Sequence, residues 1–175
     1  QYDKQEHAVF LSGNGPLVAV LREALVRDEI KRCKGKITKI TSKRKVAAFI
    51  QNIHHFRDTY LPPSEQVPAE KVTIFDEAQR AWTKEQTAKF MLKRHVPSWN
   101  MSEPEFLISV MDRHQDWAVI ICLIGGGQEI HTGEAGLLAW FDALRNHFPH
   151  WNVYVSPQIS DVEYTQGKPL ESLFM

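Results

Sequence analysis

The sequence lacks three features that would each point to a particular class of protein. Its two cysteines, Cys33 and Cys122, are widely spaced and make neither a disulfide framework nor a zinc-ligand pair, which fits a reducing compartment. No stretch approaches the ~18 consecutive apolar residues that a membrane-spanning helix needs. The formal net charge is +0 at pH 7, so only local patches could attract nucleic acid or a membrane surface. We therefore expect a cytoplasmic protein without a membrane segment.

The length and composition are those of an ordinary globular protein. The chain has 175 residues, of which 43% are apolar and 24% are charged, and this is enough for one domain with a sizeable core. The first residue is Gln1 rather than methionine, and strand-like sequence begins almost at once, at Ala8. We therefore expect this chain to be part of a longer protein.

The most informative stretch is a short apolar run followed by two acidic residues. Val72–Phe75 is typical of a buried strand, and Asp76-Glu77 follows it directly. In an open α/β sheet, ligands bind just outside the carboxyl ends of the strands. Because neighbouring residues at a strand end point in different directions, one carboxylate can hold a metal ion through water while the other faces a substrate water. The alternative interpretation is a strand that ends in a solvated acidic turn.

Apolar periodicity predicts an alternation of strands and helices along the chain. Short apolar runs indicate strands at 8–12, 72–76, 118–124 and 151–155. Helical spacing indicates helices at 16–28, 46–60, 83–94, 103–114 and 137–147, with Thr83 and Ser102 as N-caps. The 118–124 run is the most apolar, so we expect a central strand covered on both faces. The alternation predicts an α/β fold, a three-layer sandwich with a mostly parallel sheet.

Two further segments carry candidate binding residues. The turn Gly13-Asn14-Gly15-Pro16 precedes a helix whose expected apolar face is Leu17, Val20, Leu21, Ala24 and Leu25. Its glycines would let a phosphate approach the helix N-terminus, although an ordinary strand-to-helix turn explains them equally well. The 118–124 strand ends in Gly125-Gly126-Gly127-Gln128, which presents an amide at the carboxyl edge of the sheet.

The segment 31–45 is basic and contains neither an acidic nor an aromatic residue. Its cations are Lys31, Arg32, Lys34, Lys36, Lys39, Lys43, Arg44 and Lys45. Such a run can bind phosphates without sequence preference, or it can be a solvated loop. Both interpretations stay open.

Taken together, these stretches resemble the Schlafen group 3 DNA/RNA helicase-like family, bacterial proteins of the P-loop ATPase class. The resemblance rests on VTIFDEAQRAW at 72–82, CLIGGGQEIHTGEAG at 122–136 and VFLSGNGPLVAVLREAL at 9–25. The first of these is similar to a Walker B segment with a DEAQ box. The resemblance covers most of the chain, from Val9 to about Leu144, and the combination is more specific than any one piece.

The resemblance implies a hydrolytic role for three residues. Asp76 would hold Mg²⁺ through water, and Glu77 would act as general base on the attacking water. Gln128 would contact the γ-phosphate of ATP or that water. Further nucleotide contacts are implied for Gln79, Arg80, Gly126 and Gly127. DNA or RNA would be contacted by Gly13, Asn14, Lys34, Lys36 and Lys39.

A phosphate loop of the form G-x-x-x-x-G-K-[ST] does not occur in these 175 residues. In the family, that loop and its strand lie just upstream of the segment that matches 8–12, so we expect them before Gln1. The fold class is then a P-loop NTPase-like (RecA-like) core, one domain over 1–175, incomplete at its N-terminus. We expect 118–124 beside 72–76 beside 8–12, with the open edge of 118–124 covered by 151–155, by the tail or by a second copy of the chain.

Three functional hypotheses follow from these patterns. The first is part of an ATP-dependent helicase-like or nucleic-acid-remodelling enzyme, of which this chain alone would be inactive. The second is a non-hydrolysing module for nucleic acid or protein that keeps the fold without a phosphate loop. The third is an unrelated metal-dependent hydrolase using Asp76 and Glu77, which lacks a His/Asp ligand cluster to complete its site.

Overall fold

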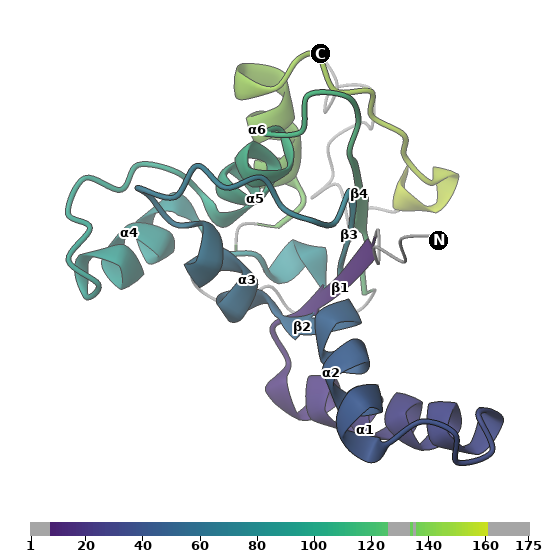
Figure 1. The fold of residues 1–175 in the computed structure, drawn as a ribbon. Coiled ribbons are helices and arrows are strands. Elements are labelled where there is room, and N and C mark those ends of the chain that lie inside the picture. Colours follow the sequence, from purple (N-terminus) through teal and green to yellow (C-terminus); the bar gives the residue numbers. More distant parts are fainter. Residues whose placement is uncertain (1–7, 126–133, 135, 161–175) are drawn as a thin grey trace. The chain divides into compact units, whose positions relative to one another are not determined.

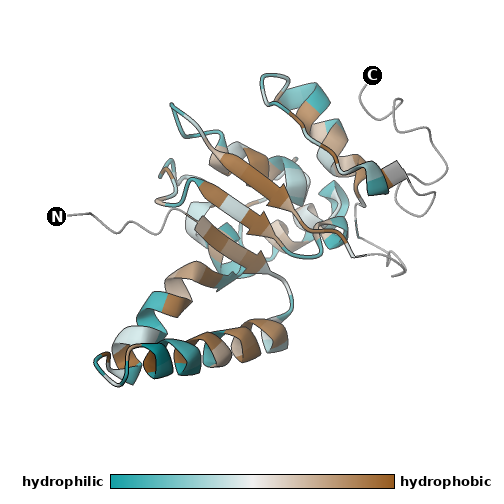
Figure 2. Cartoon of the chain, turned by 90° about the vertical axis from the view of Figure 1, so that its right-hand side faces the viewer, coloured by the Kyte–Doolittle hydropathy of each residue, from teal (hydrophilic) through white to brown (hydrophobic). Residues whose placement is uncertain are grey.

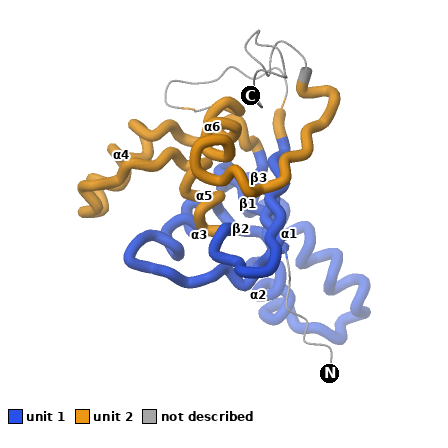
Figure 3. Tube along the Cα trace, turned by 90° about the horizontal axis from the view of Figure 1, so that it is seen from above, with its two compact units in different colours: residues 1–76, 111–123 blue, residues 77–110, 124–175 orange. Residues whose placement is uncertain are grey.

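The chain divides into two compact units, which Figure 3 shows in different colours. The computed structural model describes residues 8–125, 134 and 136–160. Unit 1 comprises residues 1–76 and 111–123, and unit 2 comprises residues 77–110 and 124–175. Each unit therefore contributes one of the two candidate carboxylates, Asp76 in unit 1 and Glu77 in unit 2.

Among the described residues, unit 1 contains a four-stranded sheet in which every pair is parallel (Figure 1). Its strands are β1 (Ala8–Ser12), β2 (Ile50–Asn52), β3 (Val72–Phe75) and β4 (Val119–Cys122). They lie in the order β2-β1-β3-β4. The predicted α/β class with a parallel sheet is confirmed, and so is the predicted adjacency of the segments at 118–124, 72–76 and 8–12.

The register of the sheet aligns the strand ends. Val72 of β3 pairs with Ala8 of β1 on one side and with Val119 of β4 on the other. Parallel strands that start level also finish level, so β1, β3 and β4 end at one edge. That edge carries whatever follows Ser12, Phe75 and Cys122.

Three helices complete unit 1, and they correct one prediction. They are α1 (Gly15–Arg32), α2 (Lys39–Phe49) and α3 (Ile53–Tyr60). The single helix predicted at 46–60 is wrong, because β2 interrupts it. Ile50 is buried and pairs with Phe10 of β1, while the Asn52 side chain accepts a hydrogen bond from the backbone N–H of His54 and caps α3.

The apolar face predicted for α1 is also partly wrong. Val20 is 66% exposed and Ala24 is exposed, whereas Val18, Val26 and Glu29 are buried. The reason is the partner that α1 covers. Figures 1 and 2 both show α1 running beside α2, away from the sheet. A helix that packs against one other helix buries a narrower stripe of its side chains than a helix that packs against a sheet.

The position of β4 differs from the prediction of a central strand covered on both faces. β4 ends the sheet among the described residues. Val119, Ile121 and Leu123 alternate along it and are 42%, 41% and 44% exposed, although the strands are mostly apolar, as Figure 2 shows. Alternate side chains of a strand share one face, so no described element fully covers this face of β4.

The predicted strand at 151–155 is wrong as well. Residues 152–156 have no regular secondary structure, and Tyr154 is 92% exposed. Val155 instead packs on a small core of unit 2 formed by Leu137 and Phe141. A strand also needs a partner for its backbone groups, and 151–155 pairs with no described strand.

Unit 2 consists of helices and loops. Its elements are α4 (Lys84–Leu92), α5 (Glu103–Met111, with Met111 assigned to unit 1), α6 (Leu138–His147) and the short 3-10 helices η1 (Ala78–Arg80) and η2 (Pro157–Ser160). The predicted caps are confirmed: Thr83 Oγ1 accepts from the Gln86 N–H and Ser102 Oγ from the Glu105 N–H. Within the described part of the chain, no helix is long and apolar enough to cross a bilayer.

A buried carboxylate joins α1 to α2. Glu29 accepts hydrogen bonds from Ser42 Oγ and Lys45 Nζ, each at 2.6 Å. The hydrogen bond from Lys45, followed by that from Ser42, lowers the pKa of Glu29 below its ordinary value of 4.5. A lowered folded-state pKa contributes stability above the unfolded-state pKa, and that contribution is lost as the pH falls through the folded-state pKa.

The first prediction concerns this pair of helices. Glu29→Gln should lower the free energy of unfolding at neutral pH, and the difference from wild type should narrow as the pH falls below about 4.5. Urea titration at a series of pH values measures it. Asp28→Asn is the matched control, because Asp28 is exposed and pairs with Arg32 of the same helix and exposed pairs contribute little. An equal loss in both variants, or a difference independent of pH, would contradict this account of Glu29.

Candidate functional site

Asp76 is held at the end of β3 by the neighbouring strand β1. Its backbone N–H donates to the carbonyl of Leu11 at 2.9 Å, which extends the ladder by one residue. Ser12 Oγ donates to Asp76 Oδ2 at 2.9 Å, and Ser12 is only 1% exposed. Ser12 was not among the residues predicted from the sequence. The signal for it is positional, because the last residue of one parallel strand faces the end of the next.

The Asp76 carboxylate suits a water-mediated contact to a divalent cation. One oxygen is fixed by Ser12, and the other, Oδ1, accepts no hydrogen bond from the described residues. These residues also contain no group of three or more His, Cys, Asp or Glu side chains that could hold a metal ion. The predicted Mg²⁺ contact of Asp76 stays a prediction.

Gly13 and Asn14 lie at the same edge as Asp76. The backbone N–H of Asn14 donates to Ser12 Oγ at 3.2 Å, and its side-chain oxygen accepts from the N–H of Leu17 at 3.1 Å. Asn14 is therefore the N-cap of α1. A Cβ atom added at Gly13 would lie no closer than 3.9 Å to Ile53, so packing does not demand glycine there. The predicted contact of this turn with nucleic acid stays a prediction.

Glu77 begins unit 2 in a left-handed backbone conformation, with φ 52° and ψ 46°. Such values are uncommon for a residue other than glycine and persist where surrounding contacts fix them. They turn the chain sharply from β3 into η1, where the N–H of Arg80 donates to the carbonyl of Glu77 at 2.8 Å. The Glu77 side chain accepts a hydrogen bond from Gln79 Nε2 at 2.6 Å.

Gln79 and Gly125 hold Glu77 in a three-residue arrangement that we call the Glu77 clasp. Gln79 is 6% exposed, and its amide makes two hydrogen bonds of 3.4 Å with the backbone N–H and carbonyl of Gly125. A Cβ atom added at Gly125 would lie 2.9 and 3.0 Å from the two carboxylate oxygens of Glu77. Glycine at 125 is thus required for Glu77 to keep this position. The nucleotide-binding role predicted for Gln79 stays a prediction.

The segment after the glycine-rich loop also attaches to η1. Arg80 forms an ion pair with Glu134 at 2.9 Å. Trp82 and Glu134 form an antiparallel bridge, and the N–H of Gly136 donates to the carbonyl of Gln79 at 3.1 Å. Arg80 therefore helps to hold this segment, and its predicted contact with a nucleotide stays a prediction. The remaining predicted site residues of this loop, Gly126, Gly127 and Gln128, lie outside the described residues.

The predicted nucleic-acid lysines are remote from the strand ends. Lys34 and Lys36 lie in the connection between α1 and α2, and Lys39 is the first residue of α2. Since α1 starts beside the edge and spans 18 residues, its far end lies roughly 27 Å from its start. The structure therefore does not bring Lys34, Lys36 and Lys39 together with Asp76.

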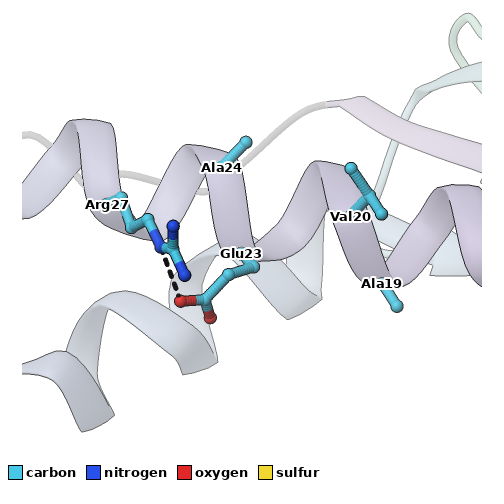
Figure 4. A pocket seen from close by; sticks show the side chains of 5 residues that line it. All are labelled: Ala19, Val20, Glu23, Ala24 and Arg27. Carbon is cyan, nitrogen blue, oxygen red and sulfur yellow. Dashed lines mark hydrogen bonds and ion pairs between the residues drawn. The ribbon is translucent and has the colours of Figure 1, made fainter.

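A shallow hollow on α1 is not a candidate active site. Ala19, Val20, Glu23, Ala24 and Arg27 line it, and an ion pair of 2.9 Å joins Glu23 to Arg27 (Figure 4). Figure 4 shows all of these side chains on one helix. None of the predicted catalytic residues lines this hollow.

The parallel sheet, with a carboxylate at the end of β3 and a second in the turn that follows, defines an α/β protein with its candidate site at the carboxyl edge of the sheet. A model of the family described as Schlafen group 3, DNA/RNA helicase domain, matches residues 1–174. The chain belongs to this family, and the resemblance inferred from its motifs is confirmed. No curated protein and no solved structure matches the chain. The family supports a helicase-like, nucleic-acid-related role in coarse terms.

The second prediction tests the Glu77 clasp. Gly125→Ala should displace the Glu77 carboxylate and break its hydrogen bond to Gln79, because the new methyl group would occupy the space of the carboxylate. The free energy of unfolding should change by less than about 1 kcal/mol, since the end of a flexible side chain can move and a less flexible unfolded chain partly compensates.

The side-chain amide signals of Gln79 in a nuclear magnetic resonance spectrum measure the displacement. Gly13→Ala is the matched control, because its new methyl group meets only an ordinary contact at 3.9 Å. The clasp is not as described if Gly125→Ala leaves the Gln79 amide signals unchanged, or if Gly13→Ala moves them as far.

Proposed function

We propose that the chain is the part of an ATP-dependent, helicase-like enzyme that carries the acidic hydrolysis motif. One observation carries the proposal: in a member of a DNA/RNA helicase domain family, two adjacent carboxylates follow an inner strand of a parallel sheet. Ligands of open α/β sheets bind at that edge. The Walker B assignment and the dependence on ATP belong to this proposal.

The roles of the two carboxylates differ because their surroundings differ. Asp76 has one oxygen fixed by the buried Ser12 hydroxyl, so it presents its other oxygen in a defined place. Mg²⁺ bound with ATP would neutralise charge on the phosphates. Glu77 would take a proton from the attacking water, with Gln79 and Gly125 setting the position of its carboxylate.

The remaining predicted residues complete the proposal. Gln128 would contact the γ-phosphate or the attacking water, with Gly126 and Gly127 allowing close approach of the backbone. Arg80 would lie beside the nucleotide while paired with Glu134. DNA or RNA is the proposed macromolecular partner, contacted near Gly13 and Asn14 at the start of α1.

We also propose that a segment outside these 175 residues supplies the phosphate loop. Most donors for nucleotide phosphates in this class come from that loop, and the sequence contains none. β4 is the last strand of the sheet among the described residues, and its outer edge is where another parallel strand would pair. A second copy of the chain could occupy the same edge, which would make the protein self-associate.

A second candidate function is a binding module that does not hydrolyse ATP. The absence of a phosphate loop from these residues is the observation that favours it. Such a module would keep the sheet and the Ser12–Asp76 contact for structural reasons alone. The two candidates differ in whether Glu77 is needed for turnover.

The third prediction separates these candidates in a protein that includes the phosphate loop. Glu77→Gln should lower the rate of ATP hydrolysis by about 10²–10⁴-fold, the usual contribution of a general base. Binding of ATP should stay within a few-fold of wild type, because the base acts on water and not on the bound nucleotide. Steady-state phosphate release and equilibrium titration with ATP measure the two effects.

Glu65→Gln is the control, because Glu65 is exposed in the connection between α3 and β3. It removes the same charge and should leave hydrolysis unchanged. Turnover by Glu77→Gln at the wild-type rate, or no turnover by the unmodified protein, would rule out the proposed role of Glu77. The second result would favour the binding module.

A further inference from the structure

The far end of the α1–α2 hairpin carries an exposed set of cations. All the basic residues of 31–45 are exposed. Three of them pair with acidic residues of α1: Arg32 with Asp28, Lys39 with Glu23, and Lys45 with Glu29. The others form no ion pair within 4.0 Å with a described acidic residue, although Lys43 lies near enough to Glu23 to help lower its pKa. We call these others the basic tip: Lys31, Lys34, Lys36, Lys43 and Arg44.

The backbone of the connection at this end forms a well-defined turn. Lys34 and Gly35 have φ 48° and 75°, and the N–H of Gly35 donates to the carbonyl of Ile30 at 3.2 Å, closing the end of α1. Thr38 Oγ1 accepts from the N–H of Thr41 and caps α2. The backbone that carries the tip therefore needs little further ordering when a ligand binds, and only the side chains have to be ordered.

Several contacts hold α1 and α2 together behind the tip. The Glu29 carboxylate accepts hydrogen bonds from Ser42 Oγ and Lys45 Nζ. Val26 of α1 and Val46 of α2 are buried. Closer to the sheet, Arg22 Nε donates to the carbonyl of Ile50 at 2.7 Å. The hairpin is thus joined to the sheet at one end and presents its charge at the other.

The chemistry of the tip points to phosphate groups. Ammonium and guanidinium groups neutralise backbone phosphates and release counterions, whatever the base sequence. Proteins that bind single strands add aromatic side chains on which bases stack, and residues 31–45 contain no aromatic residue. A duplex keeps its bases stacked inside and offers its phosphates outside, which matches a surface of cations alone.

We propose that the basic tip binds the phosphate backbone of a nucleic-acid duplex without sequence preference. The inference rests on the proposed function, because it names the kind of nucleic acid that a helicase-like enzyme would bind. The proposed contact surface lies about one helix length away from the strand ends, where Asp76 lies. The first turn of α1 lies beside Ser12 and its last turn beside the tip, so one helix links the two places.

The test measures binding of the 175-residue chain to a fluorescein-labelled DNA duplex of about 20 base pairs at about 50 mM salt, by fluorescence anisotropy. The variant combines Lys34→Asn, Lys36→Gln and Lys43→Gln; asparagine suits the left-handed backbone at position 34. The matched control combines Lys84→Gln, Lys89→Gln and Lys93→Gln, which removes the same charge from exposed positions on and after α4. Thermal unfolding of each protein checks that it is folded.

The tip variant should bind the duplex at least about tenfold more weakly, and its slope of log K against log salt should fall by about 2–3. The control should bind within about twofold of wild type. The separated single strand should bind more weakly than the duplex to the wild-type protein, and replacing the duplex sequence should change nothing.

Four outcomes would overturn the inference. They are no binding of the duplex by the wild-type chain, equal losses in the tip variant and the control, tighter binding of the single strand, and a change in affinity when the duplex sequence is replaced. The assay contains no ATP, so it is independent of ATP hydrolysis. If Glu77→Gln turns over normally but the tip still binds duplex, the proposed function fails and this inference stands.

Discussion

The parallel pairing of β1 with β3 is the constraint on which the rest of the site depends. The pairing runs from Ala8 opposite Val72 to Leu11 opposite Phe75, and it continues into the hydrogen bond from Asp76 to Leu11. Ser12 thereby faces Asp76. An antiparallel pairing would put the ends of the two strands at opposite edges, and Asp76 would lose both partners.

The same pairing determines where the other elements begin. Directly after Ser12 the chain turns at Asn14 into α1, whose far end carries the basic tip. Directly after Asp76 it turns at Glu77 into η1. The left-handed conformation of Glu77 costs of order 1–3 kcal/mol, and the contacts of Gln79 and Gly125 offset part of that cost. Strain of this kind fits a residue whose carboxylate must lie in a particular place, even though its backbone conformation lowers the stability of the fold.

Much of this fold was predictable because it depends on local signals. The apolar runs of β1 and β3, the caps at Thr83 and Ser102 and the acidic pair are all visible over a few residues. The order of β1, β3 and β4 was also predictable, once the motifs suggested which family the chain belongs to. Asp76 and Glu77 could be singled out from the change of polarity at the end of β3.

The failures have a common cause in long-range contacts. β2 has three residues and no periodicity of its own, so the sequence of 46–60 is typical of one helix. The strand forms only because Ile50 pairs with Phe10 of β1, which is distant in sequence. The segment 151–155 has the composition of a strand but no strand beside it. Gly125 was predicted as part of a glycine-rich loop, yet its requirement for glycine comes from Glu77, distant in sequence. Ser12 was missed for the same reason.

The central claim is that Asp76 is the metal contact of a nucleotide site at the end of β3. Its most direct test is a crystal structure of a protein that includes the phosphate loop, soaked with Mn²⁺ and a non-hydrolysable ATP analogue. Anomalous scattering locates the Mn²⁺ ion. We expect one ion bridged by water to the Asp76 carboxylate, beside the nucleotide phosphates, with Glu77 not a ligand. An ion bound elsewhere, or a nucleotide bound with Asp76 still facing only Ser12, would contradict the claim.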